Sequence, residues 1–390
     1  MRRQTLCIIL AMILLALGLC PSAMAAELNL EAPSAVLMDL ETGTILYESN
    51  AREKLPPASV TKVMTLLLIM EAIDSGKIGW NDPVTASEAA AAKGGSQVYL
   101  KVGETMTVED MVKSIAVSSA NDCACAMAEL IGGSEAGFVE LMNRRAQELG
   151  MKDTHFVNCT GLDDEPEAAE HLTTAYDIAL MSRALLKDHP DIKRFTTIWM
   201  DSVRGGAFGL SNTNKLVRFY DGTTGLKTGY TSTAGHCLSA SALRDGLELI
   251  AVVLHCPSSA ARFSSARALL DYGFANYALI PVQEENLPQV GVTLGKTGSL
   301  TVNVQGESQL LVDKALRQGV TRTIELPETI DAPVTQGQVL GTLTVESAGQ
   351  ILASVPLTAA ESVERLSWWE LFLLALRPVA MAASDDSVAP

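Results

Sequence analysis

Apolar and polar residues are arranged differently in successive parts of this chain of 390 residues. Near the start, the apolar-rich runs Ser34–Leu40 and Thr44–Glu48 flank Glu41-Thr42-Gly43, a pattern typical of a β-hairpin. A nearly continuous apolar run then covers Val60–Ile73. Because this run is too long for a typical strand and too short to cross a bilayer, it predicts a helix buried in the centre of a domain.

Helical periodicity continues through the middle of the chain. Thr107-Val108-Glu109-Asp110 has the form of a capping box, and apolar residues at helical spacing follow it. The same kind of pattern predicts helices over Ser134–Gly150 and from Thr174 to about Lys187. A last helix is predicted over about Ala260–Tyr277.

Strand-like runs precede that last helix, at Leu226–Ser232, His236–Leu243 and Leu247–Leu254. Two strands at the start and three at the end, with helices between them, predict an α/β fold with one mainly antiparallel five-stranded sheet covered by helices. We expect this domain to span residues 27–280. Short alternating runs broken by Gly and Pro then predict a small all-β domain, a β-sandwich over residues 285–361.

The N-terminus has the pattern of a secretory signal. Arg2 and Arg3 precede the apolar run Leu6–Leu19 and the small residues Ala23-Met24-Ala25. We therefore expect residues 1–26 to be a signal peptide and the protein to be exported to the outer face of the cytoplasmic membrane.

The C-terminal segment predicts an amphipathic helix over residues 362–380, with Trp368 and Trp369 at the level of lipid headgroups. Polar residues interrupt the segment, so it does not read as a membrane span. The alternative is a helix packed against the β-domain. Residues 381–390 are expected to form a disordered tail.

Charge and cysteine content exclude several classes of protein. The formal net charge of −16 becomes −18 when Arg2 and Arg3 leave with the signal, so we expect no nucleic-acid partner. An odd number of cysteines remains, which disfavours a full disulfide framework, and Cys123 and Cys125 are expected to be small buried thiols. Cys123 and Cys125 lie two residues apart on a helix, where side chains diverge, so no metal site is expected. The remaining cysteines are Cys123, Cys125, Cys159, Cys237 and Cys256.

Three short motifs carry the candidate chemistry: Ser59-Val60-Thr61-Lys62, Ser119-Ala120-Asn121 and Lys227-Thr228-Gly229. A hydroxyl nucleophile needs a base, a proton relay and an anion-binding strand, and the motifs supply these parts in this order. Ser59 begins the buried helix, and Lys62 follows one turn later on the same face. To act as a base, Lys62 must lose its charge, so burial and a neighbouring cation have to lower its pKa from about 10.4 towards roughly 7 to 8.

The second and third motifs fit the other steps of a serine acyl transfer. Ser119 and Asn121 lie two apart at a helix end, where both can face one cleft, the first to pass a proton to a leaving amine and the second to bind a peptide backbone. Lys227 and Thr228 are suited to grip a carboxylate, and Gly229 permits close approach of the backbone. A second copy, Lys296-Thr297-Gly298, lies between short strands of the β-domain and is interpreted as a turn.

The motifs, their order and the stretches Asn212–Leu216 and Arg262–Phe274 resemble the low-molecular-mass penicillin-binding proteins, the serine D-alanyl-D-alanine carboxypeptidases of peptidase family S11. The likeness covers about residues 30–360. It implies a penicillin-binding/β-lactamase-like catalytic domain. It also implies that Ser59 attacks the carbonyl between two terminal D-alanines of a peptidoglycan stem peptide, giving an acyl-enzyme that water hydrolyses.

The resemblance assigns a role to each candidate residue and implies no cofactor or metal. The partners it implies are peptidoglycan stem peptides and β-lactam antibiotics, which would acylate Ser59 because they resemble the substrate. For Arg262 the alternative is an ordinary arginine on a helix surface. The implied catalytic residues are Ser59, Lys62 and Ser119, the substrate-binding residues are Asn121, Lys227, Thr228, Gly229 and Arg262, and the oxyanion hole consists of the backbone N–H groups of Ser59 and Tyr230.

Two rival functions stay open at this point. A β-lactamase uses the same motifs together with a glutamate-activated water, but no Glu-x-x-Leu-Asn segment follows the second motif. A non-catalytic wall-binding protein would keep a vestigial pocket, yet here every motif position is intact. A Ser-His-Asp hydrolase is disfavoured because the chain lacks a Gly-x-Ser-x-Gly elbow.

Overall fold

The structure is a computed structural model that describes residues 28–164, 166–283 and 286–385. The chain forms two compact units. Of the described residues, the first unit contains those up to Met38, Ile45–Ala240 and Ala251–Leu270. The second contains Asp39–Thr44, Ser241–Ile250 and the described residues from Asp271 onwards. The predicted signal peptide lies outside the described residues.

The predicted five-stranded antiparallel sheet is present, with the strand order β2-β1-β9-β8-β7. Strands from both ends of the predicted catalytic domain therefore meet in one sheet. Its strands are β1 (Ser34–Asp39), β2 (Ile45–Ser49), β7 (Thr223–Thr231), β8 (Gly235–Arg244) and β9 (Leu247–Cys256).

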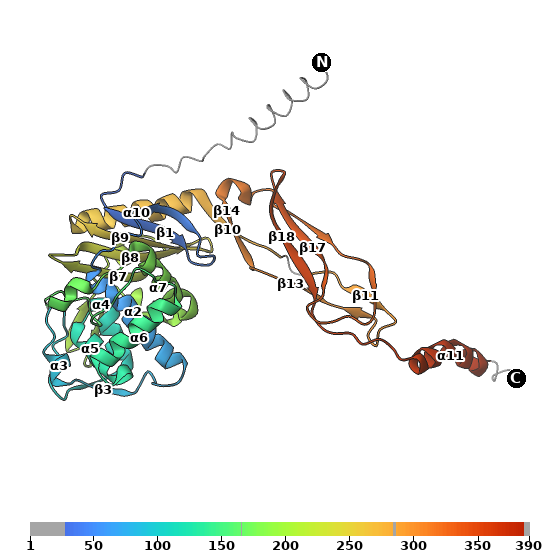
Figure 1. Ribbon diagram of the computed structural model, residues 1–390, viewed down its shortest axis with the longest axis horizontal. Coiled ribbons are helices and arrows are strands. Elements are labelled where there is room, and N and C mark those ends of the chain that lie inside the picture. Colours follow the sequence, from blue (N-terminus) through green and yellow to red (C-terminus); the bar gives the residue numbers. More distant parts are fainter. Residues whose placement is uncertain (1–27, 165, 284–285, 386–390) are drawn as a thin grey trace, which may run out of the picture. The chain divides into compact units, whose positions relative to one another are not determined.

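Helices cover this sheet, with α10 on one face and the helical group around α2 and α7 on the other (Figure 1). Two short two-stranded sheets, β3 with β4 and β5 with β6, accompany the helices. The helices are η1 (Ala58–Thr61), α2 (Lys62–Asp74), α3 (Glu88–Ala91), α4 (Val108–Ser118), α5 (Asn121–Gly132), α6 (Glu135–Glu148), η2 (Pro166–Glu170), α7 (Ala175–Asp188), η3 (Pro190–Ile192), α8 (Lys193–Thr196), α9 (Leu216–Phe219) and α10 (Ser259–Asn276). The strands of these two sheets are β3 (Pro83–Thr85), β4 (Thr105–Thr107), β5 (Met200–Val203) and β6 (Phe208–Ser211).

Side-chain caps explain where three of the predicted helices begin. The hydroxyls of Thr107, Ser134 and Thr174 accept hydrogen bonds from backbone N–H groups three residues later, at 3.1, 3.0 and 3.0 Å. Such caps satisfy N–H groups that have no partner inside the helix. The capping pattern in the sequence therefore placed these starts correctly.

Helix α2 forms the centre of the first unit, as its unbroken apolar run predicts. Residues from Lys62 to Met70 are all buried, which leaves this part of the helix without a solvated face. A helix that is apolar on all sides is stable only inside a core. This is the setting that places Lys62 in the interior.

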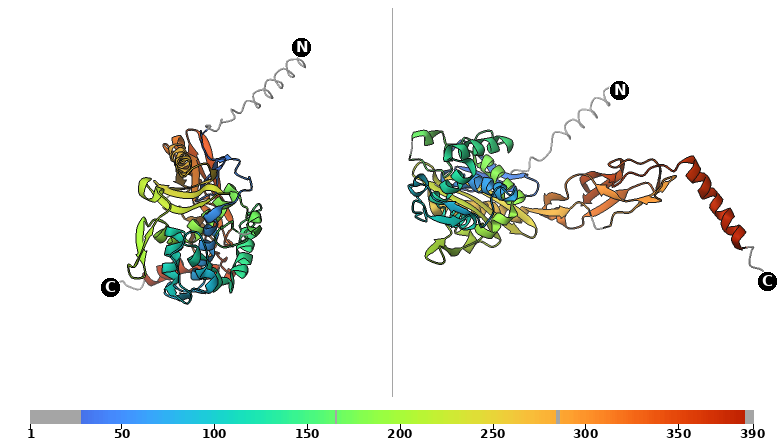
Figure 2. Two further views of the ribbon diagram at one scale, coloured as in Figure 1. Left: turned by 90° about the vertical axis from the view of Figure 1, so that its left-hand side faces the viewer. Right: turned by 90° about the horizontal axis from the view of Figure 1, so that it is seen from below.

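The second unit contains the predicted small all-β domain, drawn in orange to red in Figures 1 and 2. Three sheets build it, with the strand orders β10-β14, β12-β11-β16 and β13-β18-β17-β15. The elements are β10 (Tyr277–Pro281), β11 (Val290–Thr293), β12 (Ser299–Leu300), β13 (Val302–Val304), β14 (Gln309–Asp313), η4 (Lys314–Arg317), β15 (Thr321–Glu325), β16 (Thr329–Asp331), β17 (Val339–Ser347) and β18 (Gln350–Ala359).

The C-terminal helix differs from the expectation at both ends. Helix α11 covers Trp368–Asp385, whereas the sequence predicted a helix over residues 362–380 and disorder from 381. It begins later because Ser367 and Glu370 form a capping box, with the Ser367 N–H and the Glu370 carboxylate 2.7 Å apart. It continues further because alanine, the strongest helix former, is frequent after Arg377. Residues 386–390 of the predicted tail lie outside the described residues.

All five described cysteines are buried and free, which confirms the prediction of small buried thiols at Cys123 and Cys125.

Gly161 packs directly against the turn that carries Ser59. Its φ is +78°, and a Cβ at this position would lie 1.8 Å from the Ala58 carbonyl oxygen. We predict that Gly161→Ala destabilises the protein by roughly 3 kcal/mol, because the left-handed backbone costs an L-residue 1–2 kcal/mol and the clash forces the turn to move. Denaturant unfolding measures this loss.

Gly133→Ala is the matched control, because Gly133 has φ +76° but no atom within 4 Å of an added Cβ. Its expected cost is only the backbone cost of about 1–2 kcal/mol. Equal losses in the two variants would show that the contact with Ala58 is unimportant.

Candidate active site

The first motif places a nucleophile and an amine in contact. Ser59 is half-buried in η1, and Lys62 is the first residue of α2. Lys62 Nζ lies 2.9 Å from Ser59 Oγ and donates to the Thr160 carbonyl oxygen at 2.9 Å. The spacing of three residues puts both side chains on one face, as the sequence indicates.

Burial makes the Lys62 amine a candidate base. The side chain is fully buried, and desolvation lowers its pKa to about 7, although the nearby Cys159 and Asp122 act in the opposite direction. A substantial fraction of the amine is therefore neutral near neutral pH, as proton abstraction requires. A neighbouring cation was expected to lower the pKa of Lys62. The effect of such cations is found instead at Lys227, whose pKa is lowered mainly by burial and additionally by the charges of Lys62 and Arg262.

The second motif joins α4 to α5. Ser119 follows α4 with φ +64° and is buried, and Asn121 is the first residue of α5. Asn121 Nδ2 donates to the Gly94 carbonyl at 2.7 Å, which fixes the amide, while Oδ1 is buried without a hydrogen-bond partner among the described residues. Because buried polar atoms normally have a partner, this oxygen is suited to accept an N–H from a ligand.

The third motif lies in β7 beside the nucleophile. Lys227 and Thr228 are buried, and Thr228 Oγ1 lies 2.6 Å from Thr213 Oγ1. At Gly229 a Cβ would lie 2.6 Å from the Pro57 carbonyl oxygen and 3.1 Å from the Ser59 nitrogen. Only glycine therefore allows the strand to approach the Ser59 turn this closely.

Arg262 belongs to this region, and the alternative of a surface arginine is wrong. Its side chain is 7% exposed, and its Nη1 donates to the carbonyls of Gly229 at 3.0 Å and Cys237 at 3.3 Å. In the described part of the chain, no carboxylate is among the groups that shift the pKa of Lys227 or Arg262. Two buried basic side chains with no acidic group acting on them are suited to receive a carboxylate.

Tyr230 follows Gly229 and lies at the protein surface. Its side chain is 59% exposed, and its ring stacks on His236 with the centroids 4.3 Å apart. The Ser59 and Tyr230 backbone N–H groups come from η1 and β7, the two segments that meet at Gly229. Their role as an oxyanion hole stays a prediction.

Two functional contacts were not identified from the sequence. Thr213, which contacts Thr228, lies in the Asn212–Leu216 stretch that contributed to the family resemblance. The sequence therefore pointed to this stretch but did not assign Thr213 a role. The Thr160 contact with Lys62 uses a backbone carbonyl, which has no signature in the sequence. No cluster of three or more His, Cys, Asp or Glu in the described ranges is arranged to hold a metal.

Comparison with known proteins gives matches over most of the chain. The family profile described as D-alanyl-D-alanine carboxypeptidase matches residues 21–258, and that of the penicillin-binding protein 5 C-terminal domain matches residues 280–365. The chain is 43% identical over 346 residues to D-alanyl-D-alanine carboxypeptidase DacF of Bacillus subtilis (strain 168), covering 87% of this chain and 88% of that protein. It is 33% identical over 371 residues to DacC of Escherichia coli (strain K12), with 88% of each chain covered.

Solved structures resemble the fold as well. Penicillin binding protein 5 from Haemophilus influenzae superposes with a TM-score of 0.73 at 30% identity, covering 86% of this chain and 98% of that one. Penicillin-binding protein D2 from Listeria monocytogenes, solved in an ampicillin-bound form, superposes with a TM-score of 0.58 at 32% identity, covering 63% of this chain and 99% of that one. The motifs, the fold and these relatives agree, and the chain belongs to the D-alanyl-D-alanine carboxypeptidase family of serine peptidases, the low-molecular-mass penicillin-binding proteins.

Proposed function

We propose that Ser59 is the nucleophile of this carboxypeptidase and Lys62 its general base. The observation that carries the proposal is the 2.9 Å contact between Lys62 Nζ and Ser59 Oγ, with the amine fully buried. As Ser59 Oγ attacks the carbonyl between two D-alanines of a peptidoglycan pentapeptide stem, its proton passes to Lys62. The backbone N–H groups of Ser59 and Tyr230 stabilise the oxyanion that develops.

Collapse of this intermediate breaks the peptide bond. The leaving nitrogen takes up a proton through Ser119, terminal D-alanine departs, and the remaining acyl group stays on Ser59 Oγ as an ester. Water then attacks the ester and regenerates the serine hydroxyl. The buried position of Ser119 at the start of the Ser119-Ala120-Asn121 segment suits a proton relay that is shielded from bulk water.

Substrate binding uses the basic and polar side chains that surround Ser59. The carboxylate of the terminal D-alanine binds to Lys227 and Thr228 on β7, with Arg262 contributing positive charge. Asn121 Oδ1 accepts an N–H from the peptide backbone. The carboxylate therefore selects peptides with a free C-terminus.

β-Lactams are proposed to acylate Ser59 in place of the peptide. The Listeria penicillin-binding protein D2 has been solved in ampicillin-bound and cefotaxime-bound forms. The chain has the residues that such an acylation requires, since a β-lactam also presents a carbonyl and a carboxylate. A β-lactamase is the weaker alternative, because the relatives above are carboxypeptidases.

We further propose export and membrane association. Family members act on peptidoglycan in the cell envelope, which fits the secretory pattern of residues 1–26. No helix in the described ranges is long and apolar enough to cross a membrane. In α11, however, Trp368, Trp369 and Leu373 are 72, 58 and 53% exposed, so the apolar side chains are not packed on the β-domain and are available to lie in a lipid interface.

Ser59→Ala should abolish both release of D-alanine from a pentapeptide and labelling by a fluorescent penicillin, because no acyl-enzyme forms. Lys62→Ala should slow acylation by roughly 10²- to 10⁴-fold, the usual contribution of a general base. Gel fluorescence and mass spectrometry measure the two reactions. Ser75→Ala, at the exposed C-terminal end of α2, is the control. Near-normal labelling of Lys62→Ala would contradict its role as base.

The rate of penicillin acylation should fall as the pH drops below about 7, by roughly tenfold per pH unit, because the protonated Lys62 amine has no lone pair. Above this pH the amine is neutral and the rate should level off. Stopped-flow acylation between pH 5 and 9 gives the profile. A flat profile over that range would exclude a base that titrates near neutrality.

Replacement of both Trp368 and Trp369 by Ala should weaken binding of the protein to lipid vesicles by roughly tenfold or more, because apolar area and interfacial aromatics drive such binding. Co-sedimentation with phosphatidylglycerol-containing vesicles measures the effect. Val339→Ala removes apolar area from a residue that is 60% exposed on β17 and should bind as wild type does. Equal binding of all three proteins would rule out α11 as the membrane contact.

A further inference from the structure

The Thr160 carbonyl restricts the orientation of the Lys62 amine. Among the described residues, Nζ makes hydrogen bonds to Ser59 Oγ and to the Thr160 oxygen, each at 2.9 Å. A neutral amine has two N–H groups and one lone pair, and a carbonyl oxygen can only accept. An N–H must therefore point at Thr160, which limits rotation about the Cε–Nζ bond and leaves the lone pair free to face the Ser59 hydroxyl.

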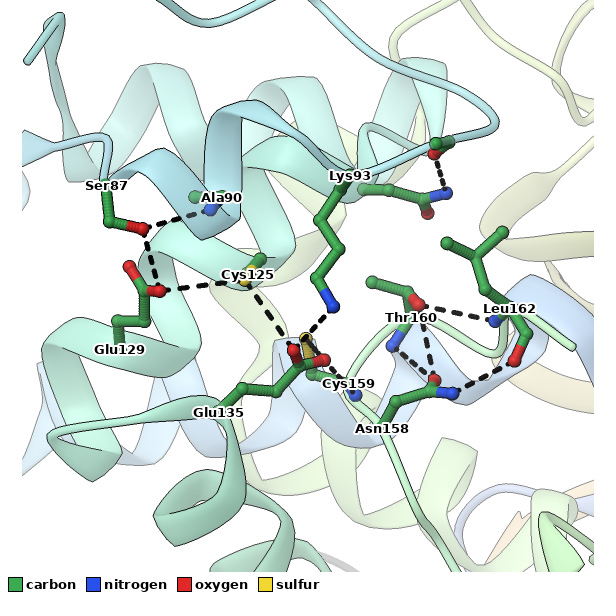
Figure 3. A network of polar contacts seen from close by, with 12 residues as sticks. Ser87, Ala90, Lys93, Cys125, Glu129, Glu135, Asn158, Cys159, Thr160 and Leu162 are labelled. Atoms are coloured by element: carbon green, nitrogen blue, oxygen red, sulfur yellow. Dashed lines mark hydrogen bonds and ion pairs between the residues drawn. The ribbon is translucent and has the colours of Figure 1, made fainter. Parts of the chain in front are cut away.

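One side chain holds this carbonyl in place. Asn158 Oδ1 accepts from the backbone N–H groups of Gly161 at 2.7 Å and Thr160 at 3.1 Å, and from Thr160 Oγ1 at 3.2 Å. Its Nδ2 donates to the Leu162 carbonyl at 2.9 Å. Figure 3 shows the Asn158 amide between Thr160 and Leu162, so a single side chain ties together both sides of the turn.

The same turn separates Lys62 from a cavity. Asn158, Thr160 and Leu162 line a partly open cavity of about 440 Å³, together with the ion-paired Lys93 and Glu135. Lys62 is completely buried behind Thr160. Opening of the turn would therefore give water in this cavity access to the amine.

The charged and titratable groups that act on the amine come from several elements. Asp122 on α5 and Cys159 favour the charged form of Lys62. Lys227 on β7 and the buried His171 both interact with the Lys62 charge, and each has a lowered pKa of its own. Desolvation is the largest influence on Lys62, so entry of water raises its pKa.

We infer that Asn158 is a positioning residue for the proposed base: it fixes the Thr160 carbonyl against Lys62 Nζ and keeps the turn closed between the amine and the cavity. The inference rests on the proposed role of Lys62. Asn158 does not touch the reacting atoms. It acts through the backbone of the turn, on the orientation and the hydration of the amine.

Asn143 offers a matched control from the same part of the chain. Its Oδ1 accepts from the Phe156 N–H and its Nδ2 donates to the Phe156 carbonyl, each at 2.8 Å. Like Asn158, Asn143 thus binds backbone groups with both the oxygen and the nitrogen of its amide. In the described residues its side chain hydrogen-bonds to the Phe156 backbone and not to the Thr160 turn or to Lys62, so its loss should affect stability alone.

The experiment compares acylation by penicillin from pH 5 to 10 in the wild-type protein, Asn158→Ala and Asn143→Ala, with thermal unfolding of each. Asn158→Ala should acylate at pH 7 roughly tenfold more slowly or worse, with the acid limb of its profile moved to higher pH by about one unit, because a hydrated amine has a higher pKa. Asn143→Ala should lose thermal stability but keep the wild-type rate and profile.

Two further variants separate orientation from folding. Asn158→Asp keeps an acceptor for the Thr160 and Gly161 N–H groups, so at pH 9, where the added charge no longer keeps Lys62 protonated, its rate should return to within about threefold of wild type. Asn158→Gln displaces the amide by one methylene and should move the acid limb as Asn158→Ala does. If Asn158→Ala does not fold, Asn158→Gln replaces it in the experiment.

A wild-type rate and an unmoved acid limb in the Asn158→Ala or Asn158→Gln protein would overturn the inference. If Lys62→Ala is inactive in that case, the proposed base survives and only the role of Asn158 is lost. Normal acylation of Lys62→Ala would overturn both the proposed base and the inference.

Discussion

The burial of one amine is the constraint on which the active site depends. Lys62 begins a helix that is buried as far as Met70, so its nitrogen is removed from water together with the apolar residues that follow it. Charge is expensive in such surroundings, and the amine responds by binding its proton less tightly. The same packing that stabilises the domain centre thus produces a basic nitrogen beside Ser59 Oγ. Stability and chemistry come from one arrangement.

Much of this arrangement could be predicted from local patterns. The first residues of the helices capped by Thr107 and Thr174 could be predicted, because a capping hydrogen bond joins residues that are only three apart in the sequence. The contact between Ser59 and Lys62 follows from helix geometry alone. A single sheet containing strands from both ends of the domain was predicted as well, since such strands must be covered to bury their apolar faces, but their order in the sheet was not.

What could not be predicted depends on backbone groups and on distant packing. The Thr160 carbonyl faces Lys62 because a turn 98 residues away folds against α2, and no residue type encodes that direction. For Arg262 the resemblance indicated a place in the site, but the alternative of a surface arginine could be rejected only from its contact with the Gly229 carbonyl. The second Lys-Thr-Gly sequence, at Lys296, illustrates the same point: its lysine is exposed and paired with Glu364, so the tripeptide gains its function only in β7.

The environment of Lys227 has a consequence for ligand binding. Burial and the neighbouring Lys62 and Arg262 hold the pKa of Lys227 well below its ordinary value in the empty site. In the proposed complex, the carboxylate of the ligand lies beside Lys227 and favours its ammonium form. Binding of such a ligand is therefore linked to protonation of this amine, and a more alkaline solution opposes it. Recognition of a chain terminus, in this proposal, depends on the charge state of one buried lysine.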